Sequence, residues 1–527
     1  MAVVVTDTRT VRTEADTTTG ITGAAGTTTS DFAEATAAVQ TSLNIATGQI
    51  YHTGAAVNLS NTMVYVYTFN NALKAGWDAA SPPQALHLGD GTNRISFRMA
   101  GGDRDVFKHP IGPVNWQCLL LDGSQASAMN SAGLTTARAG NFASLNLSAI
   151  TQMGGDFTTL SKALAGGYNV ALDIIRFGNG GIVITGGTTG DRGRFSEIAA
   201  EDRSTANLKA HGIIREFITG AFGVQGPLTF GAATGTSWFQ DSGVVVSYEN
   251  RNVGNDKYFF NVVGGTGATH FILRNSTLST AGPEVTCDFS SNNIDTLEIS
   301  GCSFVNLGRT ITFGTDTAAE AHDVIGNTFS ACGRISPGAV EFRNNVISNS
   351  TDSGGALFLT NTSQMSDITL NSGGTGHGIL ITSPGTYTLT RFTFNGYGAD
   401  GSTDAAVYNN SGGAVTLNLS GGGTGISVRN GASATTDIQN VQTFTLTGLV
   451  PNTEVRVYRK SDGVELAGVE NSGTTFSFDY NYTGDVPVDV FIHNIEYVWI
   501  GIESTLTANG VTIPIQQRFD RNYVNPD

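Results

Sequence analysis

The chain has few charged residues, few cysteines and no long apolar segment. Charged residues make up 14% of its 527 residues, against about a quarter in ordinary soluble proteins. The four cysteines, Cys118, Cys287, Cys302 and Cys332, form neither a CxxC pair nor a Cys/His spacing suited to zinc. We therefore expect buried, reduced thiols and no metal bound by them. No window approaches about 18 consecutive apolar residues, which argues against a membrane span.

Basic segments are also missing. The formal net charge is −16 and the pI is about 4.9. Because binding to nucleic acid needs clustered Lys and Arg that displace counterions from phosphates, we expect no nucleic-acid partner. Residues 1–10 contain neither a basic segment nor an apolar run of useful length, so we expect no secretory signal.

Glycine is abundant, with 67 residues, and Thr, Ser and Asn take the place of charged side chains. Long amphipathic helices need repeated Glu, Lys, Leu and Ala, whereas Gly, Asn, Thr and Val suit tight corners and short strands. The composition therefore predicts an all-β protein. At 527 residues the chain exceeds the size of a single core, so several packed units or a stacked solenoid are expected.

The first two segments differ in character. Residues 1–30 are rich in Thr, Gly and Ala and have little apolar surface to bury, which predicts a flexible or assembly arm. Residues 31–209 contain alternating apolar segments separated by turns, the pattern of an antiparallel β-sandwich. A helix is predicted over residues 156–164, because Gly166 and Gly167 follow it as a cap would.

Two segments within residues 31–209 indicate the type of β-sandwich. Residues 58–67, NLSNTMVYVY, form a strand that is first polar and then aromatic, and residues 116–122, WQCLLLD, repeat the strand rhythm. In these respects the domain resembles concanavalin-like or laminin-G-like jelly rolls. The resemblance implies a jelly-roll-like sandwich and carries over no sugar-binding residue.

Residues 210–440 contain a repeat. Six-residue windows with similar endings begin at Leu273, Ile299, Val324 and Phe342, with looser copies at Ile368, Leu389 and Val415. The steps between successive starts run from 18 to 26 residues, which is typical of the coils of a right-handed parallel β-helix.

The windows also predict the inside and the corners of each coil. Positions one and six are expected to point inward and to form apolar stacks, while the Asn, Gly and Ser residues between them turn the corner. Asn327, Asn345 and Asn371 are expected to fall in one column, where their amides hydrogen-bond from coil to coil. After residue 440 the strands become longer and alternate, so residues 441–527 are predicted to form a small β-sandwich that caps the coils.

An acidic residue immediately precedes four of the windows: Glu298, Asp323, Glu341 and Asp367. In adjacent coils such residues would lie on one face, about 4.8 Å apart. Three interpretations are open. The carboxylates form an outward, hydrated ladder that favours solubility, they bind a divalent cation such as calcium, or two of them act as the acid and the nucleophile of a glycosidase.

Ordinary enzyme motifs are absent. The sequence contains no nucleophile elbow, phosphate loop, HExxH or EF-hand loop. We therefore predict a protein that is not an enzyme, with no catalytic residue and no cofactor.

An arm, a jelly roll, a β-helix and a small terminal sandwich, in this order, resemble the plan of tailed-bacteriophage virion proteins such as tailspikes, fibres and head appendages. The resemblance implies a structural component of the virion with a role in assembly or in adhesion to the host surface. It also implies a homotrimer, contacts with other virion proteins, host surface glycan as a candidate ligand, and assembly in the bacterial cytoplasm.

Two other functions remain open. A polysaccharide-degrading tailspike enzyme would need a carboxylate pair in a groove flanked by exposed aromatic side chains. A bacterial surface adhesin would need an export signal or a sorting tail, and neither pattern is visible in the sequence.

Overall fold

The computed structural model describes most of the chain and divides it into two compact units, Met1–Ile335 and Ser336–Asp527. With 3% helix and 58% strand, it confirms the prediction of an all-β protein. The described residues are 4–7, 10–14, 21–23, 27–29, 38–43, 49–60, 62–70, 85–97, 108–110, 116–122, 135–139, 144–156, 168–178, 181–185, 194–202, 214–224, 226–231, 236–240, 243–248, 258–263, 269–280, 285–291, 294–314, 322–360, 362, 364–398, 403–420, 426–482 and 484–522.

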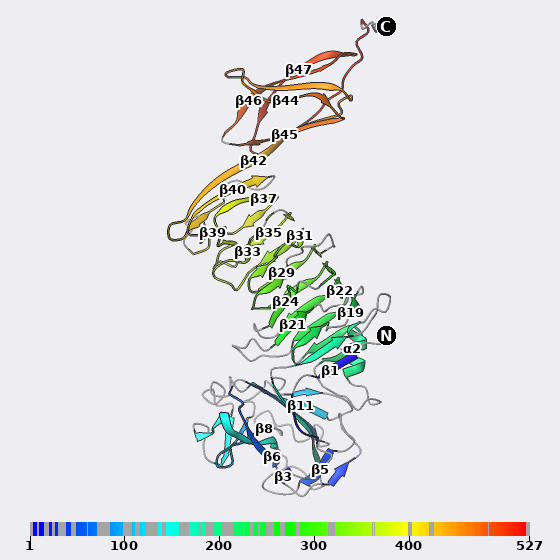
Figure 1. Ribbon diagram of the computed structural model, residues 1–527, viewed down its shortest axis with the longest axis vertical. Coiled ribbons are helices and arrows are strands. Elements are labelled where there is room, and N and C mark those ends of the chain that lie inside the picture. Colours follow the sequence, from blue (N-terminus) through cyan, green and yellow to red (C-terminus); the bar gives the residue numbers. More distant parts are fainter. Residues whose placement is uncertain are drawn as a thin grey trace. The chain divides into compact units, whose positions relative to one another are not determined.

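The first unit begins with two antiparallel sheets (Figure 1). One sheet has the order β10 (Lys108–Pro110), β11 (Trp116–Asp122), β7 (Met63–Asn70), β14 (Tyr168–Phe177), β5 (Ala38–Leu43) and β4 (Thr27–Thr29), and β2 (Thr10–Glu14) also pairs with β14. The other has the order β12 (Thr135–Ala139), β9 (Arg94–Phe97), β8 (Ala85–Gly89), β13 (Ile150–Asp156), β6 (Gln49–Val57) and β3 (Ile21–Gly23), with the short 3₁₀ helix η3 (Leu147–Ala149) leading into β13.

Residues 1–30 differ from the flexible arm that composition suggests. Their described parts form strands that pair with later segments: β1 (Val4–Asp7) with β15 (Ile182–Thr185), β2 with β14, β3 with β6, and β4 with β5. β-branched Thr and Val side chains suit such pairing even where the segment is short and polar. Backbone pairing to strands of the same chain therefore orders these parts.

The helix predicted over residues 156–164 and the helix that the structure describes are separate segments. Asp156, the first residue of the segment predicted as a helix, is the last residue of β13. The rest of that segment, residues 157–164, lies outside the described residues. A helix that the sequence pattern did not indicate, α2, spans Phe195–Asp202. Its Phe195 side chain is fully buried and lies edge-on to Trp238, with the ring centroids 5.4 Å apart. Packing of this aromatic ring, rather than a strong helical pattern, stabilises α2.

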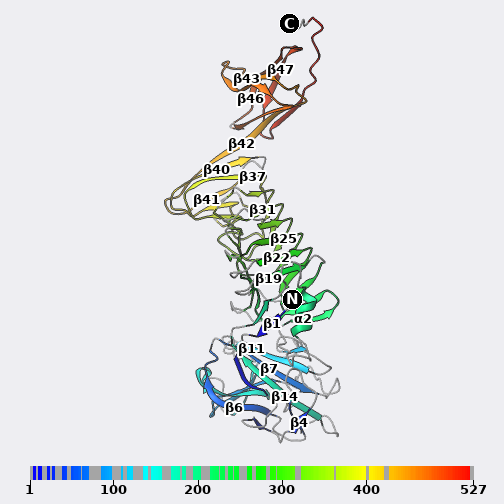
Figure 2. The same ribbon diagram turned by 45° about the vertical axis from the view of Figure 1, so that its right-hand side comes forward.

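The rest of the first unit consists of coils, each of which adds one strand to each of three parallel sheets. Figure 2 shows β19, β22 and β25 of one such sheet lying side by side. The first sheet has β15, β18 (Leu228–Phe230), β21 (Tyr258–Val262), β24 (Val285–Phe289) and β27 (Ile311–Phe313). The second has β16 (Ile214–Ile218), which is antiparallel to its neighbour, β17 (Ala221–Val224), β20 (Val245–Tyr248), β23 (Thr277–Thr280), β26 (Ser303–Val305) and β29 (Thr328–Ser330). The third has β19 (Thr236–Gln240), β22 (Thr269–Arg274), β25 (Thr296–Ser300) and β28 (His322–Ile325). This arrangement is compatible with a parallel β-helix.

The register of these coils confirms the first three sequence windows. Leu273 is paired with Ile299, and Ile299 with Val324, and all three side chains are fully buried. At the sixth window position, Phe304 and Phe329 stack with their ring centroids 4.9 Å apart. Positions one and six therefore point inward, and burial of these apolar side chains stabilises the coils.

The corners between two of the sheets depend on residues with a left-handed backbone. The third window position has a φ of 50° at Asn275, 62° at Gly301 and 70° at Gly326. Glycine, and to a lesser degree Asn, adopts this conformation at low cost. The next position holds Asn327, whose side chain accepts a hydrogen bond from the Cys302 N–H at 2.8 Å and donates to the Ile299 carbonyl at 2.9 Å.

The second unit contains coils with the same three-sheet pattern. One parallel sheet has the order β33 (Leu357–Leu359), β36 (Ile379–Ile381), β39 (Val407–Asn409) and β41 (Val428–Asn430). Another has the order β32 (Val346–Ser348), β35 (Thr369–Asn371) and β38 (Thr393–Asn395). The third has the order β31 (Glu341–Arg343), β34 (Met365–Ser366), β37 (Gly385–Thr390), β40 (Ala414–Ser420) and β42 (Thr435–Thr447). The short strand β30 (Ile335–Ser336) lies at the division between the units.

The later sequence windows agree only in part with the register of the strands. Phe342 is paired with Met365, so the window placed at Ile368 should begin at Met365. Ser366 is paired with Thr390, which puts Leu389 in line with Met365, so the window at Leu389 is correct. The window at Val415 is also shifted, because Leu389 is paired with Leu419.

The predicted Asn column is corrected in the same way. Asn371 lies on β35, in line with Ser348 and Asn395, and is bonded to both side chains at 2.9 Å. Asn345 is instead the residue that follows the corner residue Asn344, as Asn327 follows Gly326. The amides thus form coil-to-coil hydrogen bonds, but in two different columns.

A change from parallel to antiparallel pairing occurs within one long strand, β42. Val441 is paired with Ser420 in parallel and with Asn481 of β45 (Thr475–Asn481) in antiparallel fashion. β48 (Val511–Pro514) also pairs with β42. A further antiparallel sheet has the order β44 (Glu465–Ser472), β43 (Thr453–Arg459), β46 (Val486–Asn494) and β47 (Tyr497–Leu506), and its inner side packs on β42 around Val455, Val490 and Phe444. The change occurs at Val441, inside β42.

Candidate functional site

Two of the four predicted carboxylates lie on the first unit and are direct neighbours. Glu298 on β25 is paired in register with Asp323 on β28. Arg274 on β22 donates two hydrogen bonds to Glu298, at 2.5 and 2.6 Å, and Ser300 donates a third at 3.0 Å. The hydrogen bonds from Arg274 hold the pKa of Glu298 below its ordinary value. Glu298 is therefore part of an ion pair that joins two coils.

The other two carboxylates lie on the second unit, in different positions of their coils. Glu341 on β31 forms an ion pair with Arg343. Asp367 was expected to occupy the equivalent position, but the residue in line with Glu341 is Gln364. Asp367 is a corner residue with a φ of 58°, so the four carboxylates do not form the single column that the sequence suggested.

Asp367 also has an arginine partner. Arg391, one coil further on, donates to its two carboxylate oxygens at 2.5 and 2.7 Å. This pairing, together with a hydrogen bond from Ser366, holds the pKa of Asp367 below its ordinary value. An open polar depression of about 490 Å³ lies beside this pair and is lined by Glu341, Arg343, Thr362, Gln364, Met365, Ser366, Thr390 and Arg391.

Arginine pairing changes the three interpretations of the acidic residues. Within the part of the chain that the structure describes, no group of three or more His, Cys, Asp or Glu side chains is placed to hold a metal ion. Arginine partners lower the pKa values of Glu298 and Asp367, whereas a glycosidase acid needs a raised pKa. Glu298 and Asp367 instead form ion pairs that join neighbouring coils, and Glu341 pairs with Arg343 of its own strand.

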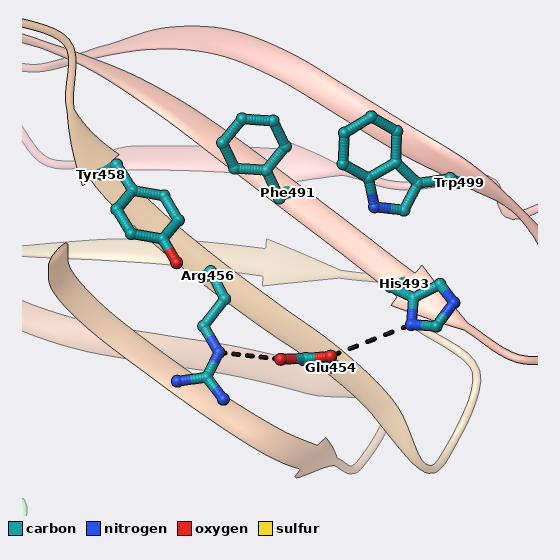
Figure 3. Close-up of a pocket in the computed structure, with 6 residues that line it drawn as sticks. All are labelled: Glu454, Arg456, Tyr458, Phe491, His493 and Trp499. Atoms are coloured by element: carbon teal, nitrogen blue, oxygen red, sulfur yellow. Dashed lines mark hydrogen bonds and ion pairs between the residues drawn. The ribbon is translucent and has the colours of Figure 1, made fainter. Parts of the chain in front are cut away.

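A different surface of the second unit has the features of a binding site. It is the outer face of the β44-β43-β46-β47 sheet, and we call it the aromatic depression. It has a volume of about 710 Å³ and is lined by Glu454, Arg456, Tyr458, Phe491, His493 and Trp499 (Figure 3). Strand alternation positions these side chains, because Val455 and Val457 point into the core while their neighbours in the strand point outward.

The middle of the aromatic depression is one row of residues that crosses all four strands. Gly468 on β44 is paired with Arg456 on β43, Arg456 with Phe491 on β46, and Phe491 with Gly501 on β47. The two glycines leave room for the large side chains between them. A Cβ at Gly468 would lie 2.8 Å from Arg456 Cδ, and a Cβ at Gly501 would lie 4.0 Å from the Phe491 ring.

Aromatic rings form one side of the depression. Phe491 stacks against Trp499, with the ring centroids 5.3 Å apart and the planes inclined by 17°. Tyr458 lies edge-on to Phe491 at 5.7 Å. Figure 3 shows the three rings following one another along the depression. Trp499 is 59% exposed, and an exposed, flat ring of this size is a common anchor for ligands.

Charged groups form the other side. Arg456 donates to Glu454 at 2.9 Å and to Glu465 at 3.1 Å, and Glu470 lies 3.6 Å away. Glu454 and Glu465 raise the pKa of Arg456. The Nδ1 atom of His493 lies 3.8 Å from Glu454, as Figure 3 shows. The depression thus offers planar polar groups with several hydrogen-bond donors and acceptors beside flat apolar rings.

Sequence reasoning did not single out these six residues. The signal that could have found part of them is the strand alternation itself, in which Phe491 occupies a solvent-facing position between the buried Val490 and Ile492 and Tyr458 follows the buried Val457. Large aromatic residues at positions that a sandwich leaves to solvent indicate a binding surface.

Comparison with known proteins gives no relative for this chain. No protein-family model matches it, and neither a curated protein nor a solved structure does. Among the described residues, no helix has the length and apolar character to cross a membrane. A functional assignment therefore rests on the geometry of the depression and of the coils.

Proposed function

We propose that this protein is a non-enzymatic structural component of a tailed-bacteriophage virion, part of a tail spike, a fibre or a head appendage, that attaches to the host surface. The observation that carries the adhesive role is the aromatic depression, where the exposed ring of Trp499 stacks on Phe491 beside the charged groups of Glu454 and Arg456. Exposed apolar patches rimmed by polar groups mark interaction sites on protein surfaces.

The coils suit a structural role. We propose that they form a right-handed parallel β-helix, that the antiparallel sheets before them form a jelly-roll-like domain, and that residues 441–527 form a small sandwich. Fully buried stacks such as Phe304 on Phe329, and hydrogen bonds between coils such as that of Asn327 to Cys302, support a rigid scaffold.

The absence of a catalytic step is part of the proposal. Glycoside hydrolysis needs one carboxylic acid that is protonated near neutral pH, whereas Glu298 and Asp367 are both bound to arginines that keep them ionised. In the aromatic depression Glu454 is likewise bound to Arg456. This charge state supports binding over cleavage.

Assembly completes the proposal. We infer a homotrimer in contact with other virion proteins, assembled in the bacterial cytoplasm, on the plan of phage appendages. The buried, raised-pKa thiols of Cys302 and Cys332, which form no disulfide, suit that reducing compartment.

Electron microscopy of phage particles tests this location. Gold-conjugated antibodies raised against the recombinant chain are applied to purified particles whose genome encodes it, with a phage that lacks the gene as the control. We expect labelling at a fixed place on the head or tail of the encoding phage alone. Label on the host cell envelope and none on the particles would instead identify a bacterial surface adhesin.

A further inference from the structure

We propose that the aromatic depression binds a glycan built of neutral or amino-bearing pyranose units and rejects glycans that carry carboxylate groups. The inference rests on the proposed adhesive function and names the chemistry of its ligand. Two features of the depression carry it: the charges around it and the stacked rings within it.

Negative charge dominates the face around the depression. Arg456 has three carboxylates within 3.6 Å, which are Glu454, Glu465 and Glu470. Because these carboxylates outnumber the one guanidinium, Arg456 has no charge left with which to attract an anionic ligand.

The row of paired residues next to the one that contains Arg456 has two more carboxylates. Tyr458 is paired with Asp489, and Asp489 with Glu503, so two more carboxylates follow one another across the sheet. Lys460 binds Glu503 at 2.7 Å. Five carboxylates therefore share this face with the two fixed cations Arg456 and Lys460. A carboxylated ligand would meet net repulsion here, and an ammonium group would meet attraction.

The rings supply a surface that suits a sugar. Trp499 and Phe491 form a flat, exposed apolar strip, and the C–H face of a pyranose ring covers such a strip while its hydroxyl groups remain at the rim. Glu454, Arg456 and His493 lie at that rim and can exchange hydrogen bonds with hydroxyl groups. An amino group gains in addition from the electron-rich faces of the rings.

Nucleic acid also stacks on aromatic rings, but its phosphates would face the same five carboxylates, and the chain as a whole has a net charge of −16.

Binding to an array of glycans tests the ligand class. The full-length chain, labelled with a fluorophore, is applied to an array that presents the common pyranoses of bacterial surfaces as oligomers in neutral, amino-bearing and carboxylated forms. We expect the bound members to be neutral or amino-bearing, with carboxylated counterparts bound at least about tenfold more weakly, equivalent to about 1.4 kcal/mol. Preferential binding of carboxylated members, or binding of no member at all, overturns the proposal.

Variants then assign the binding to the depression. For the best-bound glycan, Trp499→Ala is expected to weaken affinity at least about tenfold, and Trp499→Phe to restore most of it. Phe519→Ala is the matched control, because Phe519 is an aromatic side chain 56% exposed that does not line the depression. Equal affinity of the native chain and Trp499→Ala would place the glycan elsewhere and overturn the assignment.

A gain-of-function variant tests the role of charge. Glu465→Gln combined with Glu470→Gln removes two carboxylates beside Arg456 and is expected to increase the affinity for carboxylated glycans severalfold while changing neutral binding less than about twofold. No gain for carboxylated glycans would contradict the charge argument. Cell adhesion that persists without glycan binding would overturn the ligand class and leave the adhesive function standing.

Discussion

Arg391 binds Asp367 across one coil of the second unit through two hydrogen bonds, of 2.5 and 2.7 Å. The first unit contains the same relationship between Arg274 and Glu298, at 2.5 and 2.6 Å. In each pair, the guanidinium and the carboxylate come from neighbouring coils, and each pair uses both carboxylate oxygens. Glu298 and Asp367, which the sequence placed in one ladder of carboxylates, therefore each join one coil to the next.

These pairs reverse the expected effect of neutralising the acidic residues. A chain of unpaired carboxylates would gain stability on substitution by amides, whereas Glu298→Gln removes an ion pair and is expected to lower the melting temperature slightly. Because both side chains are partly exposed, the loss is at most about 1 kcal/mol. Scanning calorimetry of Glu298→Gln, Arg274→Gln and the double variant measures the coupling between the two residues. A double variant whose loss equals the sum of the single losses would show that the pair does not stabilise the coils.

The same pairs predict the sign of the pH dependence. Arg274 and Arg391 lower the pKa values of Glu298 and Asp367 from their ordinary values of 4.5 and 3.8. A carboxylate with a lowered pKa in the folded state contributes stability above its unfolded pKa and loses that contribution as the pH falls through its folded pKa. The melting temperature of the native chain should therefore fall below about pH 4.5, and fall less in the Glu298→Gln, Asp367→Asn variant. Identical slopes for both proteins would contradict this assignment.

The inward stacks predict a large effect for one charge placed inside a coil. Phe329 is fully buried against Phe304, so Phe329→Asp would bury an unpaired carboxylate at a cost of several kcal/mol. We expect insoluble protein on expression. Thr328→Asp is the matched control, since Thr328 lies beside it on β29 with its side chain exposed. Soluble, fully folded Phe329→Asp would mean that the register of the coils is wrong.

The thiols of the coils are predicted to be unreactive in the native protein. Cys287, Cys302 and Cys332 are buried thiols, and burial raises the pKa of Cys302 and of Cys332 to about 11. Because the thiolate is the reactive form, iodoacetamide at pH 8 should leave all three unmodified until urea unfolds the chain. Mass spectrometry of the corresponding peptides measures this. Rapid labelling of Cys302 without urea would contradict the burial of that coil.

The sequence predicted those parts of the fold that leave a local signature. Each coil needs a left-handed residue at its corner, and Asn275, Gly301 and Gly326 mark three corners in the sequence. The all-β class follows from the same composition. The antiparallel pairing of residues 1–30 was not predicted, because pairing between distant segments has no local signature in a short polar strand.

The error at Asp367 has a physical reason. One buried residue lies two positions before a corner residue and another lies directly after it, so an apolar residue on either side can be mistaken for the start of a window. Ile368 follows the corner residue Asp367, and Met365 is the true equivalent of Phe342. The pattern of buried and polar residues is nearly the same before and after the corner, so the sequence alone does not show on which side a window begins. Only the pairing of the strands shows it.

The arginine pairs and the aromatic depression depend on contacts between separate strands. Arg274 and Glu298 lie on neighbouring coils, and Arg456, Phe491 and Gly501 come from three strands that register brings into one row. No spacing within a single segment indicates either arrangement. The alternation of apolar and polar residues in the sequence indicates which side chains face outward. The order and register of the strands then determine which of those side chains are in contact.

Attachment to host cells tests the central claim most directly. Fluorescently labelled native chain, Trp499→Ala and Phe519→Ala are each incubated with cells of the phage host, and bound protein is measured by flow cytometry. We predict saturable binding of the native chain and of Phe519→Ala, and at least about a tenfold loss of affinity for Trp499→Ala, as expected when an exposed anchor is removed. Equal binding of all three proteins, or no binding of the native chain, would contradict the account.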